Sequence, residues 1–543
     1  MTPLRPVAAA LAACLLVAGV AACLAAPGPP PLAEEGDTAA KTETETGTPT
    51  DTPTLRTRTQ VQVGVDRLRN GLNPHLVDDE SEVVRDVAKL VLPSAFVDGV
   101  RDPDVLEAAT VLPTTPAPGI AMTVRYVIAD EAQWSDGTPI TGADFVYLWR
   151  GMSSTPGVVD PAGYRAIAQV RVLGERGKTV DVDFRAPVRE WTALFDFLLP
   201  SHVLAVDASD FATALSETIP ASAGRYMVAN VDRGRGTLTL NRNDRYWGPD
   251  PAHIDILTLA SVRETTQLAD QLRVGQLAFV DKAPKETTGT VLSLVPGVQT
   301  RFVDGPRTLG VTLSVSSQLL GTLEAREELR SLIDVPLLAR VAAGRTSDLP
   351  VAEHRPVSQE EPAILPGLVR SHHPVRVGAD PSDAEAAAAA RSLVDILASR
   401  GVDAQVVSTD TRSLTAESLP SGVVDVVVGW ATNTGTAPAL AGRLYCQPET
   451  HRAGNLSGLC TSETEAVADD ILAGRLRGAP ARAAVAEALD AAAVWVPVLH
   501  ERRIHGLTGG IVGPSPDLEQ WPGGLATAAQ WRMGAPDPEQ APN

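Results

Sequence analysis

DEAQWSDGTPITGADF, residues 130–145, is the stretch on which our interpretation of the fold depends most. Asp136-Gly137 predicts a tight turn, because glycine adopts positive φ at little cost. Thr141 is a suitable N-cap for a helix, and Asp144 stands three residues later, where an acid can complete a capping box. These are scaffold roles, so we interpret Trp134 as a core residue rather than a ligand contact.

Strand and helix patterns alternate on both sides of this stretch. Residues 123–128 (TVRYVI) and 179–184 (TVDVDF) have strand character. Residues 374–409 predict a strand, a helix capped by Ser382, and a second strand. VDVVVGW, residues 424–430, is apolar enough for a central strand. With no internal repeat visible, this alternation predicts a large α/β or α+β assembly.

Three further blocks accompany residues 130–145 in a fixed order along the chain. They are 199–204 (LPSHVL), 223–226 (AGRY) with 240–248 (LNRNDRYWG), and 425–430 (DVVVGW) with 455–458 (NLSG). Together the four blocks resemble, in the same order, the family-5 extracytoplasmic solute-binding proteins, which include dipeptide, oligopeptide and nickel binders. The resemblance spans roughly residues 60 to 510. It implies a two-lobed periplasmic-binding-protein-like fold of the class II or cluster C type, with an extra inserted subdomain.

The resemblance also implies a division of the chain. Residues 59–85, 223–300 and 495–543 would form lobe I, residues 86–222 the extra subdomain, and residues 301–494 lobe II. Function would then come from closure of the lobes on a ligand, a hinge motion that a partner senses.

Three other segments go beyond the general family pattern: 70–76 (NGLNPHL), 90–96 (LVLPSAF) and 156–164 (PGVVDPAGY). They resemble an actinobacterial lipoprotein branch often named monoacyl phosphatidylinositol tetramannoside-binding proteins. Members of that branch are implicated in controlling phosphatidylinositol mannoside and lipoarabinomannan synthesis.

The residues after Gly429-Trp430 depart from those of the peptide binders. In peptide binders an acidic residue shortly after this pair commonly holds the amino group of the peptide, whereas residues 431–436 here read ATNTGT. A buried ammonium without a counter-charge is costly. The hydroxyl and amide groups of this segment suit a neutral, hydroxyl-bearing ligand better.

Four residues are therefore our candidates for ligand binding. Trp430 is the first, and Thr432, Asn433 and Asn455 follow it. Trp430 as a plain core tryptophan remains an open alternative.

The N-terminus resembles a bacterial lipoprotein signal, in which a cysteine is lipidated and becomes the new N-terminus. Arg5 precedes a small-and-apolar run that ends at Cys23. Residues 1–22 would be removed, and residues 23–58, rich in Pro, Thr and Glu, would form a disordered tether. The alternatives are a transmembrane anchor, although no basic stop-transfer cluster follows, and lipidation at Cys14, which leaves a short apolar core. We expect a lipid anchor on the extracytoplasmic face of the cell membrane.

Composition and charge limit the possible partners. The chain is 44% hydrophobic and 21% charged, as globular proteins are. Its net charge of −20 argues against nucleic acid, whose phosphates require basic patches, and against lying flat on an anionic membrane.

The sequence offers no support for an enzyme. It lacks G-x-S-x-G, H-E-x-x-H, P-loop and dinucleotide-binding motifs. His500-Glu501 would point to opposite faces of a strand, so the two side chains could not share a site. We expect no catalytic residues, no metal site and no cofactor.

Two cysteines follow the signal, Cys446 and Cys460. A pair in an exported chain predicts a disulfide. Zinc would need more ligands at short spacing, and only His451 lies between them. Free thiols remain the alternative.

Two function classes stay open. The first is a transport receptor that delivers peptide or a similar solute to an ABC permease. The second is a glycolipid-binding or regulatory factor of envelope biosynthesis, with a membrane glycosyltransferase as a possible partner. The branch resemblance favours the second class, and the fold alone does not decide. In either class we expect a monomer that binds a small-molecule ligand, either a glycolipid headgroup or a peptide.

Overall fold

The computed structural model describes five stretches of the chain: 58–113, 118–205, 211–432, 434–446 and 454–534. They all belong to one compact unit, residues Thr57–Asn543. Cys23 and the segments predicted as signal and tether lie outside the described residues, apart from the last tether residue, so these calls stay predictions. Within the described stretches, no helix is both long and apolar enough to cross a membrane.

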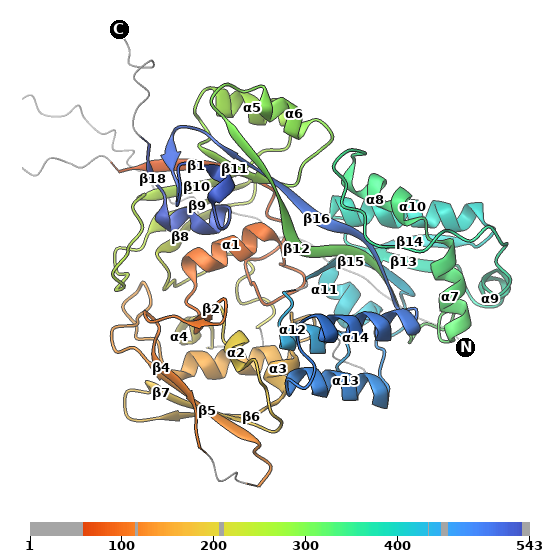
Figure 1. Ribbon diagram of the computed structural model, residues 1–543, viewed down its shortest axis with the longest axis horizontal. Coiled ribbons are helices and arrows are strands. Elements are labelled where there is room, and N and C mark those ends of the chain that lie inside the picture. The colour runs from red at the N-terminus through yellow and green to blue at the C-terminus, as the bar shows by residue number, and fades with distance from the viewer. Residues whose placement is uncertain (1–57, 114–117, 206–210, 433, 447–453, 535–543) are drawn as a thin grey trace, which may run out of the picture. The chain divides into compact units, whose positions relative to one another are not determined.

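A ten-stranded sheet runs through the unit (Figure 1). In order across the sheet, its strands are β14 (Ala404–Ser408), β13 (Val375–Ala379), β15 (Val426–Thr432), β12 (Gln299–Leu313), β16 (Trp495–Leu507), β11 (Phe279–Lys282), β1 (Gln60–Val65), β10 (Ile256–Ser261), β9 (Thr237–Arg242) and β8 (Tyr226–Asp232). β1 lies parallel between β10 and β11, and β13 lies parallel between β14 and β15. We call the β1 side lobe I and the β13 side lobe II.

β12 and β16 connect the two lobes. They pair antiparallel along almost their whole length, with a break in register between Asp304 and Thr308. One end of β12 pairs with β16 beside β11, and its other end pairs with β15. The break therefore lies where the chain passes from one lobe to the other. The domain boundaries expected from the sequence stay a proposal.

Helices cover both lobes. Lobe I carries α1 (Glu82–Val91), α5 (Thr265–Arg273) and α6 (Thr288–Ser293), and lobe II carries α7 (Leu323–Leu332), α8 (Val335–Ala343), α9 (Leu365–Ser371), α10 (Ala384–Ser399), α11 (Thr411–Ser413) with a π-helical turn (Leu414–Ser418), α12 (Ala437–Gly442), α13 (Ser462–Leu472) and α14 (Gly478–Ala491). β13, α10 and β14 confirm the predicted strand–helix–strand of residues 374–409. The predicted cap was wrong by one residue: Asp383, not Ser382, accepts a hydrogen bond from the backbone N–H of Ala386 at 3.1 Å.

A second sheet lies between α1 and β8 in the chain, in the part predicted as the extra subdomain. Its strand order is β4 (Leu106–Val111), β5 (Met122–Ile128), β7 (Thr179–Phe184) and β6 (Ile167–Leu173), all antiparallel. The same part of the chain also contains β2 (Phe96–Val97), β3 (Val100–Arg101), α2 (Gly142–Ser154), α3 (Ala162–Arg165) and α4 (Ser201–Leu204). Near the C-terminus, β17 (Ile511–Val512) and β18 (Arg532–Met533) form a separate two-stranded sheet. Short 3₁₀ turns cover Trp191–Ala193, Leu518–Gln520 and Leu525–Gln530.

Residues 130–145 lie in this subdomain and form the turn and the helix cap that their pattern predicts. The Thr141 N–H donates to Asp144 Oδ2 at 2.9 Å, which completes the predicted capping box of α2. Asp144 Oδ1 also accepts from the Ser201 hydroxyl at 2.7 Å, and Asp136 Oδ2 lies 2.7 Å from His202 Nε2. The second block of the family pattern is therefore bonded directly to the first. Both blocks have scaffold roles.

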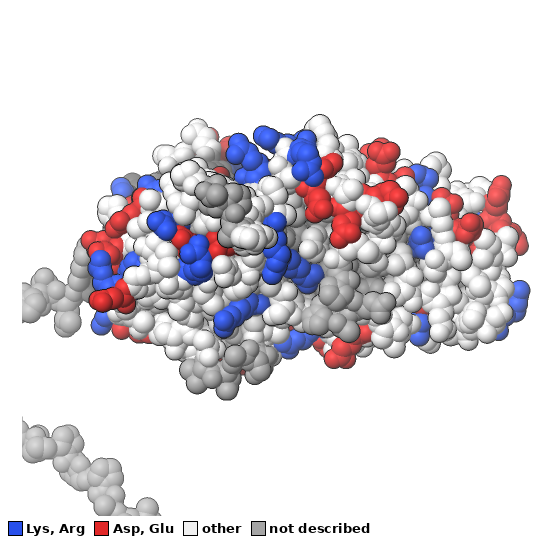
Figure 2. Space-filling view, turned by 90° about the horizontal axis from the view of Figure 1, so that it is seen from below, with Lys and Arg blue, Asp and Glu red and all other residues white. Residues whose placement is uncertain are grey.

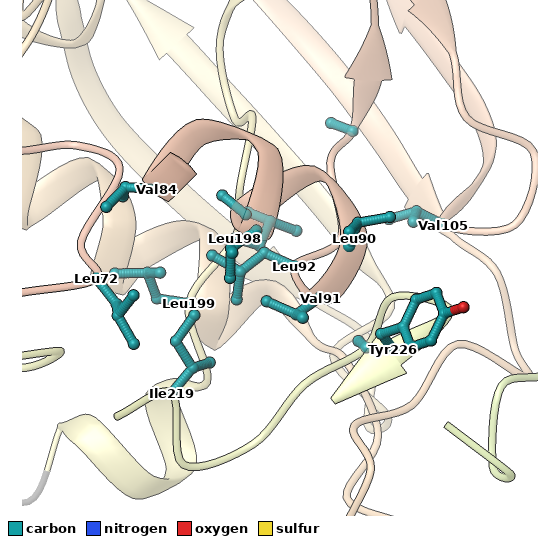
Figure 3. Packing of buried hydrophobic residues seen from close by; sticks show 14 of the residues in the cluster. Leu72, Val84, Leu90, Val91, Leu92, Val105, Leu198, Leu199, Ile219 and Tyr226 are labelled. Carbon is teal, nitrogen blue, oxygen red and sulfur yellow. The ribbon is translucent and has the colours of Figure 1, made fainter. Parts of the chain in front are cut away.

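Lobe I and the subdomain share one hydrophobic core, whereas lobe II has its own. In Figure 3, Leu90 and Val91 of α1 lie in one cluster with Leu199 and Ile219, which come from the subdomain segment. Trp134 is fully buried in the same core, so its predicted core role is confirmed. A smaller cluster packs Ala162 of the subdomain against Ala437 and Leu440 of lobe II, so the subdomain contacts both lobes.

Candidate functional site

Two neighbouring cavities lie between the lobes, beside β12 and β16. The small cavity, about 80 Å³, is lined by the segment 77–80 of lobe I and by residues of β15 and α11 of lobe II. The large cavity, about 430 Å³, is lined by residues that follow β1 and β11 in lobe I and by the end of α8 and the start of α10 in lobe II. Arg69, Asp383 and Trp430 belong to the walls of both cavities. We call the two cavities together the cleft.

Trp430 lies in the cleft wall, where the sequence predicted it. It stands on β15 opposite Leu309 of β12 and is half-buried. The Arg307 guanidinium carbon lies 5.0 Å from the centre of its ring, a cation–π arrangement. Trp430 also packs against the lobe II core, so both readings of the sequence, cleft residue and core residue, have a structural basis. Its contact with a ligand stays a prediction.

Thr432 connects the lobes. Its hydroxyl donates to Glu80 Oε1 and accepts from Arg85 Nη2 at 3.3 Å, and that Arg85 nitrogen also lies 3.1 Å from Glu80 Oε1. Glu80 and Arg85 belong to lobe I and Thr432 to lobe II. A ligand would have to compete with these bonds for the Thr432 hydroxyl. Asn433, the next candidate, lies outside the described residues.

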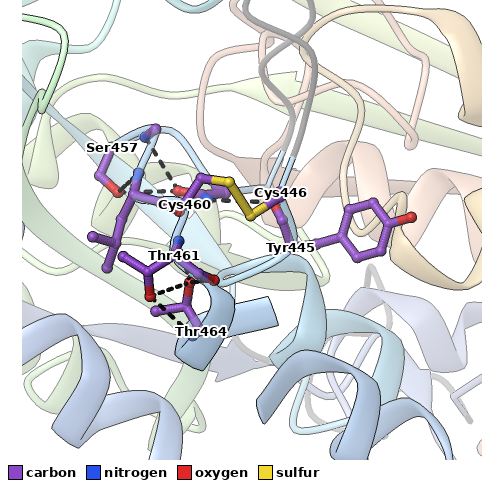
Figure 4. The surroundings of a disulfide bond; sticks show 9 residues. Tyr445, Cys446, Ser457, Cys460, Thr461 and Thr464 are labelled. Atoms are coloured by element: carbon purple, nitrogen blue, oxygen red, sulfur yellow. Dashed lines mark hydrogen bonds between the residues drawn. A yellow bond between two sulfur atoms is a disulfide. The ribbon is translucent and has the colours of Figure 1, made fainter. Parts of the chain in front are cut away.

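Asn455 is buried, and both the nitrogen and the oxygen of its side-chain amide make hydrogen bonds within its own loop. Its Nδ2 donates to the Leu459 carbonyl at 2.7 Å, and its Oδ1 accepts from the Ser457 hydroxyl at 3.0 Å. The same loop is held by a disulfide between Cys446 and Cys460, whose Cα atoms lie 5.1 Å apart (Figure 4). Asn455 lies in the wall of the small cavity, and a ligand would have to break these bonds to reach its amide.

A buried charge network lies where β12 and β16 pass from one lobe to the other. The Arg307 Nε donates to Glu501 Oε2 at 3.0 Å, and Arg307 Nη1 donates to the Glu80 carbonyl at 3.4 Å. The Arg503 guanidinium lies 3.7 Å from Glu501 Oε1 and 2.6 Å from Asp281 Oδ1. Arg307 thus contacts the candidate ligand residue Trp430, Glu501 of the neighbouring strand β16, and Glu80 of lobe I. Sequence reasoning missed this network.

A period-two pattern in β16 could have revealed it. Glu501, Arg503 and His505 stand on one face of the strand, and all three are buried. Buried charges at alternate positions of a strand must be paired, so this pattern predicts partners on the neighbouring strands. His500, the chain neighbour of Glu501, is exposed on the opposite face of the strand, as predicted.

Burial and charge shift several pKa values in the cleft. Burial raises the pKa of Glu385 to about 8, and Asp383 and Asp66 add to the shift. Burial likewise raises the pKa of Asp78 to about 6, together with Asp79 and Asp380. Glu385 therefore holds its proton at neutral pH, whereas Asp78 is largely ionised there.

A family model and several related sequences match the chain. Residues 121–358 match the family described as bacterial extracellular solute-binding proteins, family 5 Middle. Over 536 residues the chain is 31% identical to the Mycobacterium tuberculosis (strain ATCC 25618 / H37Rv) protein named Probable monoacyl phosphatidylinositol tetramannoside-binding protein LpqW, covering 96% of this chain and 76% of that protein. It is 29% identical over 297 residues to the oligopeptide-binding protein OppA of the same strain, covering 51% and 48%.

Solved structures share the fold. The oligopeptide-binding protein AppA of Bacillus subtilis, in complex with a nonapeptide, matches with a TM-score of 0.64 at 12% identity, covering 88% of this chain and 100% of that chain. At this identity the likeness concerns the fold alone. The predicted two-lobed fold is confirmed.

Proposed function

Because the chain belongs to the family-5 bacterial extracellular solute-binding proteins, we propose that it is a lipid-anchored receptor whose cleft binds the polyhydroxylated headgroup of an envelope glycolipid. The anchor would be Cys23, on the extracytoplasmic face of the cell membrane. A phosphatidylinositol mannoside is the ligand class suggested by the name of its relative LpqW. The role would be in synthesis of such glycolipids or in its regulation, with a membrane glycosyltransferase as a candidate partner.

The observation that carries this proposal is the composition of the wall around Trp430. The ring of Trp430 stands near carboxylates that already have partners: Asp383 pairs with Arg69, and Asp380 accepts from the Thr411 hydroxyl at 2.9 Å. Sugar hydroxyls can donate to such carboxylates, and a sugar face can stack on the ring.

The same wall suits a peptide ammonium less well. A peptide amino group needs an unpaired, ionised carboxylate, and Glu80 is bonded to Arg85 and Thr432. Asp78 Oδ1 already accepts from the Asn70 side-chain amide at 3.1 Å, and Asp383 is paired with Arg69. We therefore expect free peptides to bind with dissociation constants weaker than ~100 μM, or about −5.5 kcal/mol.

The alternative is a receptor that delivers peptide or a similar solute to an ABC permease. The likeness to OppA favours it, since that relative is named for oligopeptide binding.

Isothermal titration calorimetry tests the proposal on the full-length chain in detergent, with a water-soluble deacylated phosphatidylinositol mannoside and with a peptide library. We expect the mannoside to bind more tightly than ~100 μM and Trp430→Ala to abolish binding. Trp149→Ala, at another half-buried tryptophan on α2, is the matched control and should bind normally. Micromolar peptide binding that is lost in Trp430→Ala would contradict the proposal and restore the transport receptor.

A further inference from the structure

The large cavity is lined by more cations than carboxylates, whereas the chain as a whole is acidic. The chain has 46 Lys and Arg against 66 Asp and Glu. The walls of the large cavity hold eight cationic side chains against five carboxylates. On the face seen in Figure 2, in contrast, acidic and basic side chains are interspersed among wide uncharged areas.

The small cavity has the opposite balance. Its walls hold Arg69 and Arg443 against Asp78, Glu80, Asp380 and Asp383. Trp430, in the walls of both cavities, marks the boundary between an acidic end and a basic end of one cleft. A ligand that fits both ends combines hydroxyl donors with a negative charge.

Three of the eight cations are not fully neutralised by protein carboxylates. Arg67 is exposed, and its guanidinium makes no ion pair with any residue that the structure describes. Lys285 Nζ donates only to the Arg263 carbonyl, at 3.3 Å, among the described residues. Arg345 is 5% exposed, and its nearest carboxylate oxygen, on Asp348, lies 3.9 Å away.

Arg345 gives the most direct sign of missing negative charge. Its Nε is buried without a hydrogen-bond partner among the described residues, while its Nη1 donates to backbone carbonyls. Burial lowers its pKa. A buried, partly unpaired guanidinium costs free energy, which a nearby anion would offset.

The three cations come from both lobes. Arg67 follows β1 and Lys285 follows β11 in lobe I, whereas Arg345 follows α8 in lobe II. An anion in the large cavity would attract cations of both lobes and so favour closure. The first turns of α1 and α10 also line this cavity, and their N-terminal ends add partial positive charge.

We propose that the large cavity is the anion subsite of the cleft and holds a phosphodiester, with Arg67, Lys285 and Arg345 supplying the positive charge. This inference rests on the proposed function, because a phosphatidylinositol mannoside carries its phosphodiester beside the inositol and its sugars. The sugars then lie toward Trp430 and the small cavity. The forked guanidinium groups of Arg67 and Arg345 suit paired phosphate oxygens.

Calorimetry on the full-length chain separates the sources of the anion. Four probes are titrated: a deacylated phosphatidylinositol dimannoside, the same inositol dimannoside without phosphate, inorganic phosphate, and a tripeptide. The variant Arg67→Gln/Lys285→Gln changes two exposed side chains, so it should fold. Arg176→Gln, another exposed arginine far from the cleft walls, is the matched control.

We expect the double variant to bind the phosphodiester probe about tenfold more weakly and the phosphate-free probe less than about twofold more weakly. Raising the salt concentration should weaken binding of the phosphodiester probe and leave binding of the phosphate-free mannoside unchanged. Equal losses for both mannosides, or no loss for either, would overturn the anion subsite and leave the proposed function standing. Inorganic phosphate bound as tightly as the mannoside, or a tripeptide that depends on the same cations, would also overturn it. If neither mannoside binds, the proposed function itself fails.

Discussion

Replacing Arg307 with methionine should destabilise the chain strongly, because it strands a buried carboxylate. Glu501 is 3% exposed and receives two hydrogen bonds from Arg307. After the change it would keep only Arg503 at 3.7 Å, a guanidinium already shared with Asp281 at 2.6 Å. Breaking a buried pair on one side costs ~3–5 kcal/mol, and the remaining Arg503 places our value at about 3 kcal/mol.

The loss should depend on pH. In the native chain burial alone would raise the pKa of Glu501, but Arg307 outweighs burial and the net pKa is lowered. This contribution to stability is therefore present above the unfolded pKa of about 4.3 and is lost as pH falls through the folded value. Without Arg307, burial dominates and the folded pKa rises. The variant then loses stability as pH rises, so its deficit should be larger at pH ~7.5 than at pH ~5.

Urea unfolding at both pH values measures the deficit. Arg307→Met/Glu501→Met removes both charges and leaves Arg503 paired with Asp281, so it should recover most of the lost free energy. Arg502→Met is the matched control, since its pairs with Asp304 and Asp348 lie at the surface and are worth about 0–1 kcal/mol. A deficit below about 1 kcal/mol for Arg307→Met, or a double variant no more stable than the single one, would refute the reasoning.

Three further predictions concern the disulfide, the anchor and a cleft carboxylate. Cys446→Ala should cost ~3 kcal/mol and lower the melting temperature by several degrees, because the bond closes a loop with a sequence separation of 14; alkylation of free thiols in the native protein would contradict the bond. Cys23→Ser should move the protein from the detergent phase to the aqueous phase while Cys14→Ser changes little, and lipid found on Cys14 would reverse the assignment. Burial raises the pKa of Glu385 to about 8, so native stability should fall as pH rises from the unfolded value to about 8. Glu385→Gln should flatten the melting temperature over that range, and unchanged slopes would show that another group titrates.

Local features of the fold could be predicted from the sequence. The capping box of Thr141 and Asp144 needs only two residues that stand three apart in the chain. Such contacts depend on the nearby chain, so a pattern reveals them. The one-residue error at Ser382 has the same origin, because Ser and Asp are both good caps and adjacent positions compete.

The cleft could be predicted only in part. Trp430 stands in the wall as expected, near the carboxyl end of the interior strand β15. The partners that surround it could not be predicted. Arg69 and Asp383 are 314 residues apart, and their pairing depends on how the two lobes face each other. Asn455 was a candidate ligand contact, but its side-chain amide makes hydrogen bonds within its own loop instead.

Hydrogen–deuterium exchange of the full-length chain tests most directly whether the cleft is the ligand site. Adding the deacylated phosphatidylinositol mannoside should slow exchange in residues 426–432 of β15 and in residues 77–85 of lobe I, which face each other across the cleft. The peptide library should leave both segments unchanged. Protection by peptides alone, or protection by the mannoside only outside these segments, would contradict the account.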